Sequence, residues 1–269
     1  MMFHIGKKIG KIMITKLLSC AKSYAKDFID IIMPAVCVGC NRERAVKHNY
    51  CTSCLVELLH VAATNYCPRC GSSAGKFARA NIETGCSECP TILPRFSRVY
   101  RIGPYQGVIK HSIRALKYDA QFHAVDHLAK LLCYAIDQNQ TGTDYDMIMP
   151  IPMYWFARLT RGIDHTKTIA YQIARHLNIH HVNYLFKHKN IPPQVKLSRT
   201  KRIENVLGAF GISKPNAVKN KKILLVDDVT TTGATASEAA RMLIKAGCYK
   251  VDLAVIAKAE KTNPYSQEE

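Results

Sequence analysis

The chain has 269 residues, with 38 Lys and Arg against 20 Asp and Glu, 11 Cys and a single Trp. At about 150 residues per domain, this length suggests one large domain or two modest ones. With 48% apolar and 22% charged residues, the composition is that of a globular protein, which excludes disordered, collagen-like and low-complexity classes. The sequence has no run of about 18 uncharged apolar residues, so we expect no membrane span.

The net charge of +18 is concentrated in two segments. Residues 1–26 carry six Lys and no acidic residue, and residues 187–222 carry ten Lys and Arg against Glu204 alone. Charge focused in this way favours a polyanionic partner, such as nucleic acid, a phosphorylated substrate or an anionic lipid. The alternative is a solvated basic surface that serves solubility.

Residues 1–30 place apolar side chains among lysines with the spacing of a basic amphipathic helix. Such a helix could touch a membrane surface or nucleic acid, but we expect it to pack on the next domain with its lysines in water. Because lysines interrupt the apolar residues, the segment lacks the uninterrupted core of a secretory signal peptide. We therefore expect a cytoplasmic chain.

Most of the cysteines form CxxC pairs. Four pairs occur within about 53 residues, and each can present two thiolates to one Zn²⁺ ion, so two pairs complete a tetrahedral site. We predict two structural zinc ions held by Cys37, Cys40, Cys51, Cys54, Cys67, Cys70, Cys86 and Cys89. Sequential pairing is the simplest arrangement, and a crossed one stays open. The alternative to zinc is a set of disulfides in a secreted domain. We expect the other three cysteines to be small core residues: Cys20, Cys133 and Cys248.

After Arg95, short β-branched or apolar runs alternate with helical patterns. We predict strands at 98–102, 147–151, 181–185, 223–226 and 251–256, and helices at 124–138, 166–177 and 235–246. This alternation is typical of a parallel sheet with helices on both faces. Ligands of such sheets bind at the carboxyl ends of the strands.

One strand end carries a chemical pattern. The strand expected at 223–226 is followed by Asp227, Asp228, Val229, Thr230, Thr231, Thr232, Gly233, Ala234 and Thr235, and then by a helix that Gly247 ends. Small residues before a helix expose backbone N–H groups and hydroxyls to an anion. Two adjacent acids can accept hydrogen bonds from the 2′- and 3′-hydroxyls of a ribose, so the pattern describes a ribose 5-phosphate site. The alternative is an Asp-rich turn in which Thr232 or Thr235 caps an ordinary helix.

These residues carry a family resemblance. The stretch from Val226 to Thr235 resembles the signature that binds 5-phosphoribosyl 1-pyrophosphate (PRPP) in type I phosphoribosyltransferases. With the CxxC array ahead of it, the chain resembles the ComF family, which is linked to competence and DNA uptake and has the GntX-like proteins as kin. Further similar stretches are Tyr105-Gln106-Gly107, Ile113–Tyr118, Pro150-Ile151-Pro152 and Gly208-Ala209-Phe210. The resemblance implies an α/β fold of the type I phosphoribosyltransferase class, a Rossmann-like parallel sheet with flanking helices, preceded by a small cysteine-rich double zinc ribbon.

The resemblance also implies roles for particular residues. Asp227 and Asp228 would hold the ribose of PRPP and its Mg²⁺, and residues 229–235 would cradle the 5′-phosphate. The pyrophosphate side would be formed by Lys117, Arg158 and Arg161. A flexible flap would contribute Gln194, Lys196, Arg199 and Arg202.

The sequence departs from the family pattern in three places. Ile163-Asp164-His165 stands where the family commonly has Phe-Asn-Gln, and Lys187, His188 and Lys189 stand where arginines are expected. Purine-salvage relatives carry an Asp at the position of Thr231, and a threonine cannot act as acid or base toward a purine ring. This argues against purine-base salvage and leaves catalytic turnover open.

Two functions follow from these patterns. The favoured one is a protein of natural competence that binds PRPP or a related ribose phosphate and presents basic surfaces to single-stranded DNA. Its partners would include other competence proteins such as a DNA helicase or translocase. The alternative is a stand-alone phosphoribosyltransferase of nucleotide metabolism that displaces pyrophosphate from PRPP. The expected organisation is a basic N-terminal segment (1–30), the double zinc ribbon (31–94), the transferase-like domain (95–260) and a polar tail (261–269).

Overall fold

The structure, a computed structural model, describes residues 36–47, 49–75, 81–118, 123–139, 144–152, 164–188 and 204–260. Its centre is a parallel sheet of five strands in the order β1-β7-β6-β2-β3. These strands are β1 (Val99–Pro104), β2 (Met147–Pro150), β3 (His180–His181), β6 (Lys222–Thr230) and β7 (Lys250–Lys258). A separate antiparallel pair is formed by β4 (Leu185–Lys187) and β5 (Phe210–Ile212).

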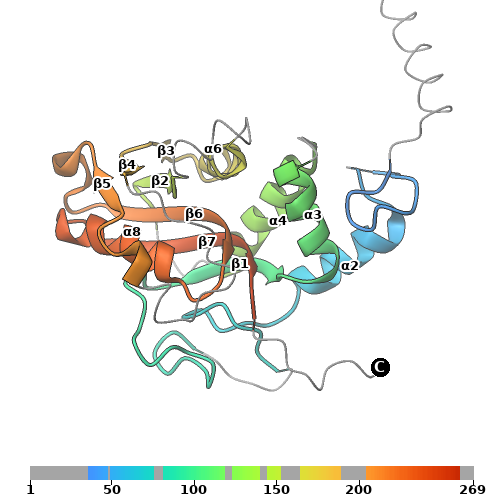
Figure 1. Cartoon of the computed structure of the whole chain (residues 1–269), viewed down its shortest axis with the longest axis horizontal. Coiled ribbons are helices and arrows are strands. Elements are labelled where there is room, and N and C mark those ends of the chain that lie inside the picture. The colour runs from blue at the N-terminus through green and yellow to red at the C-terminus, as the bar shows by residue number, and fades with distance from the viewer. Residues whose placement is uncertain are drawn as a thin grey trace, which may run out of the picture.

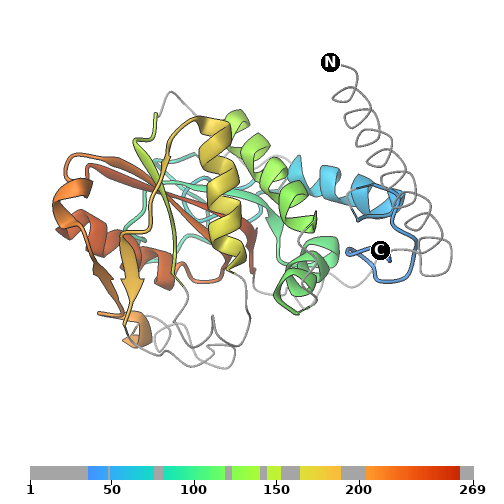
Figure 2. The ribbon, with the colours of Figure 1, turned by 90° about the horizontal axis from the view of Figure 1, so that it is seen from above.

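Helices lie on both faces of the parallel sheet. Figures 1 and 2 show α4 and α6 on one face and α8 on the other. The helices are α2 (Thr52–Ala62), α3 (Gly107–Tyr118), α4 (His123–Asn139), α6 (His165–Leu177) and α8 (Ala234–Lys245), with a short 3₁₀ helix η1 (Pro215–Val218). This arrangement confirms the predicted α/β fold. In the described part of the chain, no helix combines the length and the apolar character that crossing a membrane requires.

The core is divided by the sheet into two clusters. Along β6, Leu224 and Val226 face the cluster that contains α4 and α6, whereas Ile223 and Leu225 face the cluster that contains α8. Successive strand residues point to opposite faces, so a strand covered on both faces is apolar at every position. This explains the unbroken apolar run at 223–226. Cys133 and Cys248 are buried, as predicted, and Cys20 lies outside the described residues.

Most predicted strands and the three predicted helices are confirmed with shifted ends, but two predictions are wrong. The run 181–185 is not one strand, because the chain leaves the parallel sheet after His181 and enters the antiparallel pair at Leu185. The central strand does not end at Val226, because β6 continues to Thr230 opposite the long strand β7. A neighbour of nine residues offers backbone partners that the apolar pattern does not reveal.

The first pair of CxxC motifs packs against α3, at one end of the molecule (Figures 1 and 2). The hydroxyl of Tyr50 donates to Ser112 Oγ at 2.9 Å, and Glu57 Oε1 accepts from the Val108 amide at 3.0 Å. The carbonyl oxygen of Gly39 lies 2.7 Å from His111 Nδ1. Residues on both sides of residue 94 therefore share one apolar cluster, and the predicted domain boundary stays a prediction.

Candidate functional site

The eight paired cysteines form two groups. In each group the four sulfur atoms lie within 4.8 Å of one another, and the pairing is sequential: Cys37, Cys40, Cys51 and Cys54 in the first, and Cys67, Cys70, Cys86 and Cys89 in the second. A tetrahedral zinc ion with Zn–S bonds of about 2.3 Å requires sulfurs about 3.8 Å apart. Pairs of sulfurs 3.6–4.0 Å apart occur in both groups, so the residues fit zinc. Two tetracysteine sites are consistent with two structural zinc ions.

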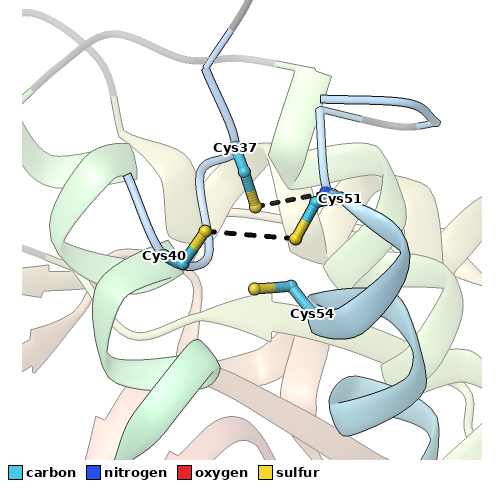
Figure 3. A group of neighbouring side chains, drawn as sticks. All are labelled: Cys37, Cys40, Cys51 and Cys54. Atoms are coloured by element: carbon cyan, nitrogen blue, oxygen red, sulfur yellow. Dashed lines mark hydrogen bonds between the residues drawn. The ribbon is translucent and has the colours of Figure 1, made fainter. Parts of the chain in front are cut away.

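In the first group, a loop meets the start of a helix (Figure 3). Cys51 precedes α2, and Cys54 lies in its first turn, so the helix holds these two sulfurs at CxxC spacing. The sulfur of Cys37 accepts hydrogen bonds from the amides of Gly39 and Cys51 at 3.3 and 3.2 Å. Hydrogen bonds from the Glu43 and Arg42 amides lower the pKa of Cys40 to about 7. Backbone donors therefore favour the thiolate, the form that binds metal, at Cys40, whereas burial raises the pKa of Cys54.

In the second group, the cysteine side chains form hydrogen bonds with one another. A hydrogen bond from Cys67 lowers the pKa of Cys70 to about 4, whereas burial raises the pKa of Cys86 to about 11. The amide of Cys86 donates to Cys89 Sγ at 3.3 Å. Zinc would displace the protons that remain on these thiols, because it binds the thiolate form.

We expect the purified full chain to carry about two equivalents of zinc, because each tetrathiolate site holds one ion. Elemental analysis together with titration of free thiols checks this. The disulfide alternative predicts no zinc and no titratable thiol among these eight cysteines, and that result would contradict the zinc sites.

The candidate phosphate loop is the turn between β6 and α8. It spans Thr231–Gly233, and Gly233 precedes the helix with a left-handed φ of 78°. The amide of Ala234 donates to Thr232 Oγ1 at 3.3 Å, and the Gly233 carbonyl accepts from Ser237 at 2.8 Å. Left-handed backbone directly before a helix is a feature of many anion-binding turns, in which successive amides face the ligand. Thr232 does contact the first turn of the helix, as the helix-cap alternative requires, so this bond does not separate the two interpretations.

The two acids lie in the last part of β6 rather than in the loop. Asp227 Oδ1 accepts from the Asp228 amide at 2.8 Å, and Asp228 Oδ1 accepts from the Val229 amide at 2.6 Å. Both residues are half-buried at the carboxyl edge of the sheet, beside Pro150 at the end of β2. The structure therefore brings together the beginnings of two stretches that resemble the family, residues 150–152 and residues 227–235.

Two lysines that sequence reasoning did not place at the site lie close to it. Burial lowers the pKa of Lys187, on β4, and the nearby negative charge of Asp227 opposes this shift. Lys258, at the end of β7, is 9% exposed and donates from Nζ to the carbonyl oxygen of Thr231. Lys187 belongs to the stretch in which the family pattern has arginines. Lys258 belongs to no motif, and only the pairing of β6 with β7 could have revealed it.

Other predicted site residues are placed only in part. Lys117 lies in α3, but its side chain is outside the described residues. Also outside them are Arg158, Arg161, Gln194, Lys196, Arg199 and Arg202. Asp164, which departs from the family pattern, caps α6 by accepting from the Lys167 amide at 3.3 Å. Its carboxylate thus has a helix-capping role, which the Asn of the family pattern could also fill.

Comparison with known proteins gives two family matches. The phosphoribosyl transferase domain model matches residues 166–268, and the double zinc ribbon domain model matches residues 28–91. Competence protein F of Haemophilus influenzae is 28% identical over 229 residues, covering 83% of this chain and 96% of that protein. The DNA utilization protein YhgH of Escherichia coli K12 is 24% identical over 228 residues, with the same coverage of both chains. Among solved structures, the glutamine PRPP amidotransferase of Bacillus subtilis complexed with ADP and GMP is similar, with 20% identity and a TM-score of 0.35, covering 50% of this chain and 26% of that one.

Proposed function

We propose that this chain, which belongs to the ComF family, serves the uptake or use of DNA and binds PRPP or a related ribose phosphate between β6 and α8. The relatives that match most of its length are named for competence and DNA utilization. The proposal also includes single-stranded DNA as a partner, with other competence proteins such as a helicase or translocase. It places the chain in the cytoplasm, where cysteine thiols remain available to zinc.

The observation that carries this proposal is the juxtaposition of two kinds of group at one sheet edge. The turn at 231–233 offers amides and hydroxyls to a phosphate, and Asp227 and Asp228 lie at the strand end that leads into it. A bare phosphate site gains nothing from two carboxylates, because their charge repels the anion. Carboxylates beside phosphate donors are useful when the ligand also carries hydroxyls, as ribose 5-phosphate does.

Mg²⁺ would bind together with PRPP at this edge, because carboxylates and phosphates are its preferred ligands. Bound there, it would neutralise charge on the pyrophosphate. Asp227 and Asp228 would hold the ribose hydroxyls directly or through metal-bound water. Lys187 would place a positive charge near Asp227 and limit the repulsion between the acids and the phosphates.

Calorimetric titration of the full chain with PRPP, with and without Mg²⁺, tests the ligand. A single-stranded oligonucleotide is then added to the same cell. PRPP binding that the oligonucleotide strengthens or weakens supports a binding protein of DNA uptake. Formation of pyrophosphate when a nucleobase is supplied would instead support the alternative, a stand-alone transferase. The threonine at 231 disfavours purine acceptors for that reaction.

Binding of single-stranded DNA is expected to depend on salt through the basic segment 187–222. Each phosphate contact releases counterions, so log K should fall with log[salt] by about 0.7 per contact. Neutralising Lys196, Arg199, Lys201 and Arg202 together should reduce this slope by a few units, equally for different sequences. As a control, Lys110 and Lys130 on helices α3 and α4 are replaced in the same way. An unchanged slope in the quadruple variant would return these residues to the solvated-surface alternative.

A further inference from the structure

The second cysteine group is connected to the candidate phosphate loop through a few neighbouring residues. The link begins at Gly71, which follows Cys70 and has a left-handed φ of 78°. A Cβ atom at Gly71 would lie 3.1 Å from Val99 Cγ1 and 3.8 Å from Cδ of Lys258. The left-handed φ favours glycine at this position, where the cysteine loop approaches the start of β1 and the end of β7.

Lys258 spans the distance from this cysteine loop to the phosphate loop. It is the last residue of β7 and pairs with Thr230 of β6 and Pro104 of β1. Its methylene stem lies near Gly71, and its ammonium donates to the carbonyl oxygen of Thr231. Lys258 is 9% exposed, and the carbonyl oxygen that its ammonium contacts belongs to the first residue of the turn.

Hydrogen bonds fasten the same cysteine loop to the sheet. The Val99 amide donates to the Pro68 carbonyl at 2.7 Å. The Glu260 carboxylate, two residues after Lys258, accepts from the Ser73 amide at 2.6 Å and from the buried Arg101 guanidinium at 3.0 Å. These contacts hold the residues around Cys67 and Cys70 against β1 and the end of β7.

The chain that leaves the cysteine group makes a second contact with the phosphate loop. Phe96 is buried, and its ring lies 3.3 Å from the position of a Cβ atom on Gly233. The Arg95 amide donates to Ser237 Oγ, in the first turn of α8, at 3.0 Å. In Figure 1 this part of the chain, coloured cyan and teal, runs below the sheet and reaches α8. The second cysteine group is thus linked to the turn at 231–233 on two sides, through Lys258 beside Gly71 and through Phe96 beyond Cys89.

We propose that the second zinc site holds the phosphate loop in its binding shape, with Lys258 and Phe96 as the positioning residues. A turn loses conformational entropy when it is ordered. Contacts that already hold the turn before a ligand binds remove this cost from the free energy of binding. Lys258 also places its side-chain nitrogen beside the turn. The inference rests on the proposed function only for the identity of the ligand, because the contacts themselves need none.

The first test uses no ligand. Amide hydrogen exchange is measured for the zinc-loaded full chain and for Lys258→Met and Cys89→Ser. We expect exchange in peptides covering 231–237 to become about tenfold faster in both variants, because each loses a support worth about one charged hydrogen bond. Lys258→Arg keeps a cationic donor and should restore most of the protection. Zinc content separates the two variants, since Lys258→Met should retain both ions.

The controls are the same types of substitution, Lys to Met and Cys to Ser, at positions away from the turn. Lys245→Met removes an exposed lysine at the far end of α8, and Cys40→Ser alters the first cysteine group, which packs on α3. Neither should change exchange at 231–237 relative to the rest of the sheet. The inference would be overturned if the exchange rate at 231–237 were unchanged in Lys258→Met. It would also be overturned if Cys40→Ser increased the exchange rate at 231–237 alone, by as much as Cys89→Ser does.

The second test adds ribose 5-phosphate. Calorimetry should show about tenfold weaker binding to Lys258→Met than to the wild type and to Lys245→Met, since the turn must then be ordered by the ligand. If the wild type binds no ribose 5-phosphate while the exchange results are as expected, the proposed ligand is wrong. The inference that the second zinc site holds the turn in shape is then still supported. If ribose 5-phosphate binds the wild type and Lys258→Met equally, the ligand stands and the positioning role of Lys258 is overturned.

Discussion

Replacing Asp227 and Asp228 together by Asn is expected to weaken the binding of PRPP with Mg²⁺ by about 2–3 kcal/mol, because charge-assisted hydrogen bonds to the ribose hydroxyls are lost. Electrostatics alone predicts the opposite sign. Removing two negative charges from an anion site should strengthen binding if the ligand uses only its phosphates. The sign of the change therefore separates recognition of the sugar from simple attraction of phosphate, and calorimetry of wild type and variant measures it.

Inorganic phosphate is the matched control ligand, because it has no diol. The double Asn variant should bind it as well as the wild type or better. Gly233→Val should weaken the binding of both PRPP and inorganic phosphate. A β-branched residue is strained at φ 78°, and its Cβ would lie 3.3 Å from the Phe96 ring. If the double Asn variant binds PRPP as tightly as the wild type, the turn is an ordinary helix cap and the ribose phosphate proposal fails with it.

The parts of this structure that the sequence predicts are those governed by local patterns. The CxxC spacing predicts the two zinc sites because both ligands of each pair lie on one short loop or turn. Apolar runs predict β2 and the core of β6, where side chains on both faces are buried. Helix α6 is predicted within one residue at its start, because His165 follows a capping Asp164 and an apolar stripe continues to Leu177.

The parts that the sequence does not predict depend on contacts between distant residues. Strand β6 runs through Asp227 and Asp228 because β7 supplies backbone partners there, and no local preference favours acids in a strand. Helix α2 is not predicted, because the cysteines at its start indicate a metal-binding loop rather than a helix. Lys187 and Lys258 come to the site only through β4 and β7. Their places follow from strand pairing, which a single sequence does not reveal.

The two cysteine groups are expected to differ sharply in their effect on stability. Cys37, Cys51 and Cys54 belong to the same buried cluster as Leu116 on α3 and Leu128 on α4. Loss of zinc from this group therefore disrupts apolar packing in the main core as well as the metal site. Cys54→Ser should lower the free energy of unfolding of the whole chain by about 5 kcal/mol, a fraction of what a structural zinc ion contributes.

Cys67→Ser is the counterpart in the second group. Cys67 and Cys70 are buried, but they lie outside both apolar clusters of the sheet and contact it through hydrogen bonds and Gly71. We expect this variant to lose the ordered structure of residues 67–75 and 81–89 while the sheet unfolds at nearly the wild-type urea concentration. Urea titration followed by far-UV circular dichroism, with zinc content measured in parallel, compares the variants. Equal losses of sheet stability in Cys54→Ser and Cys67→Ser would mean that the second ribbon also supports the core, because unfolding would then be one cooperative event.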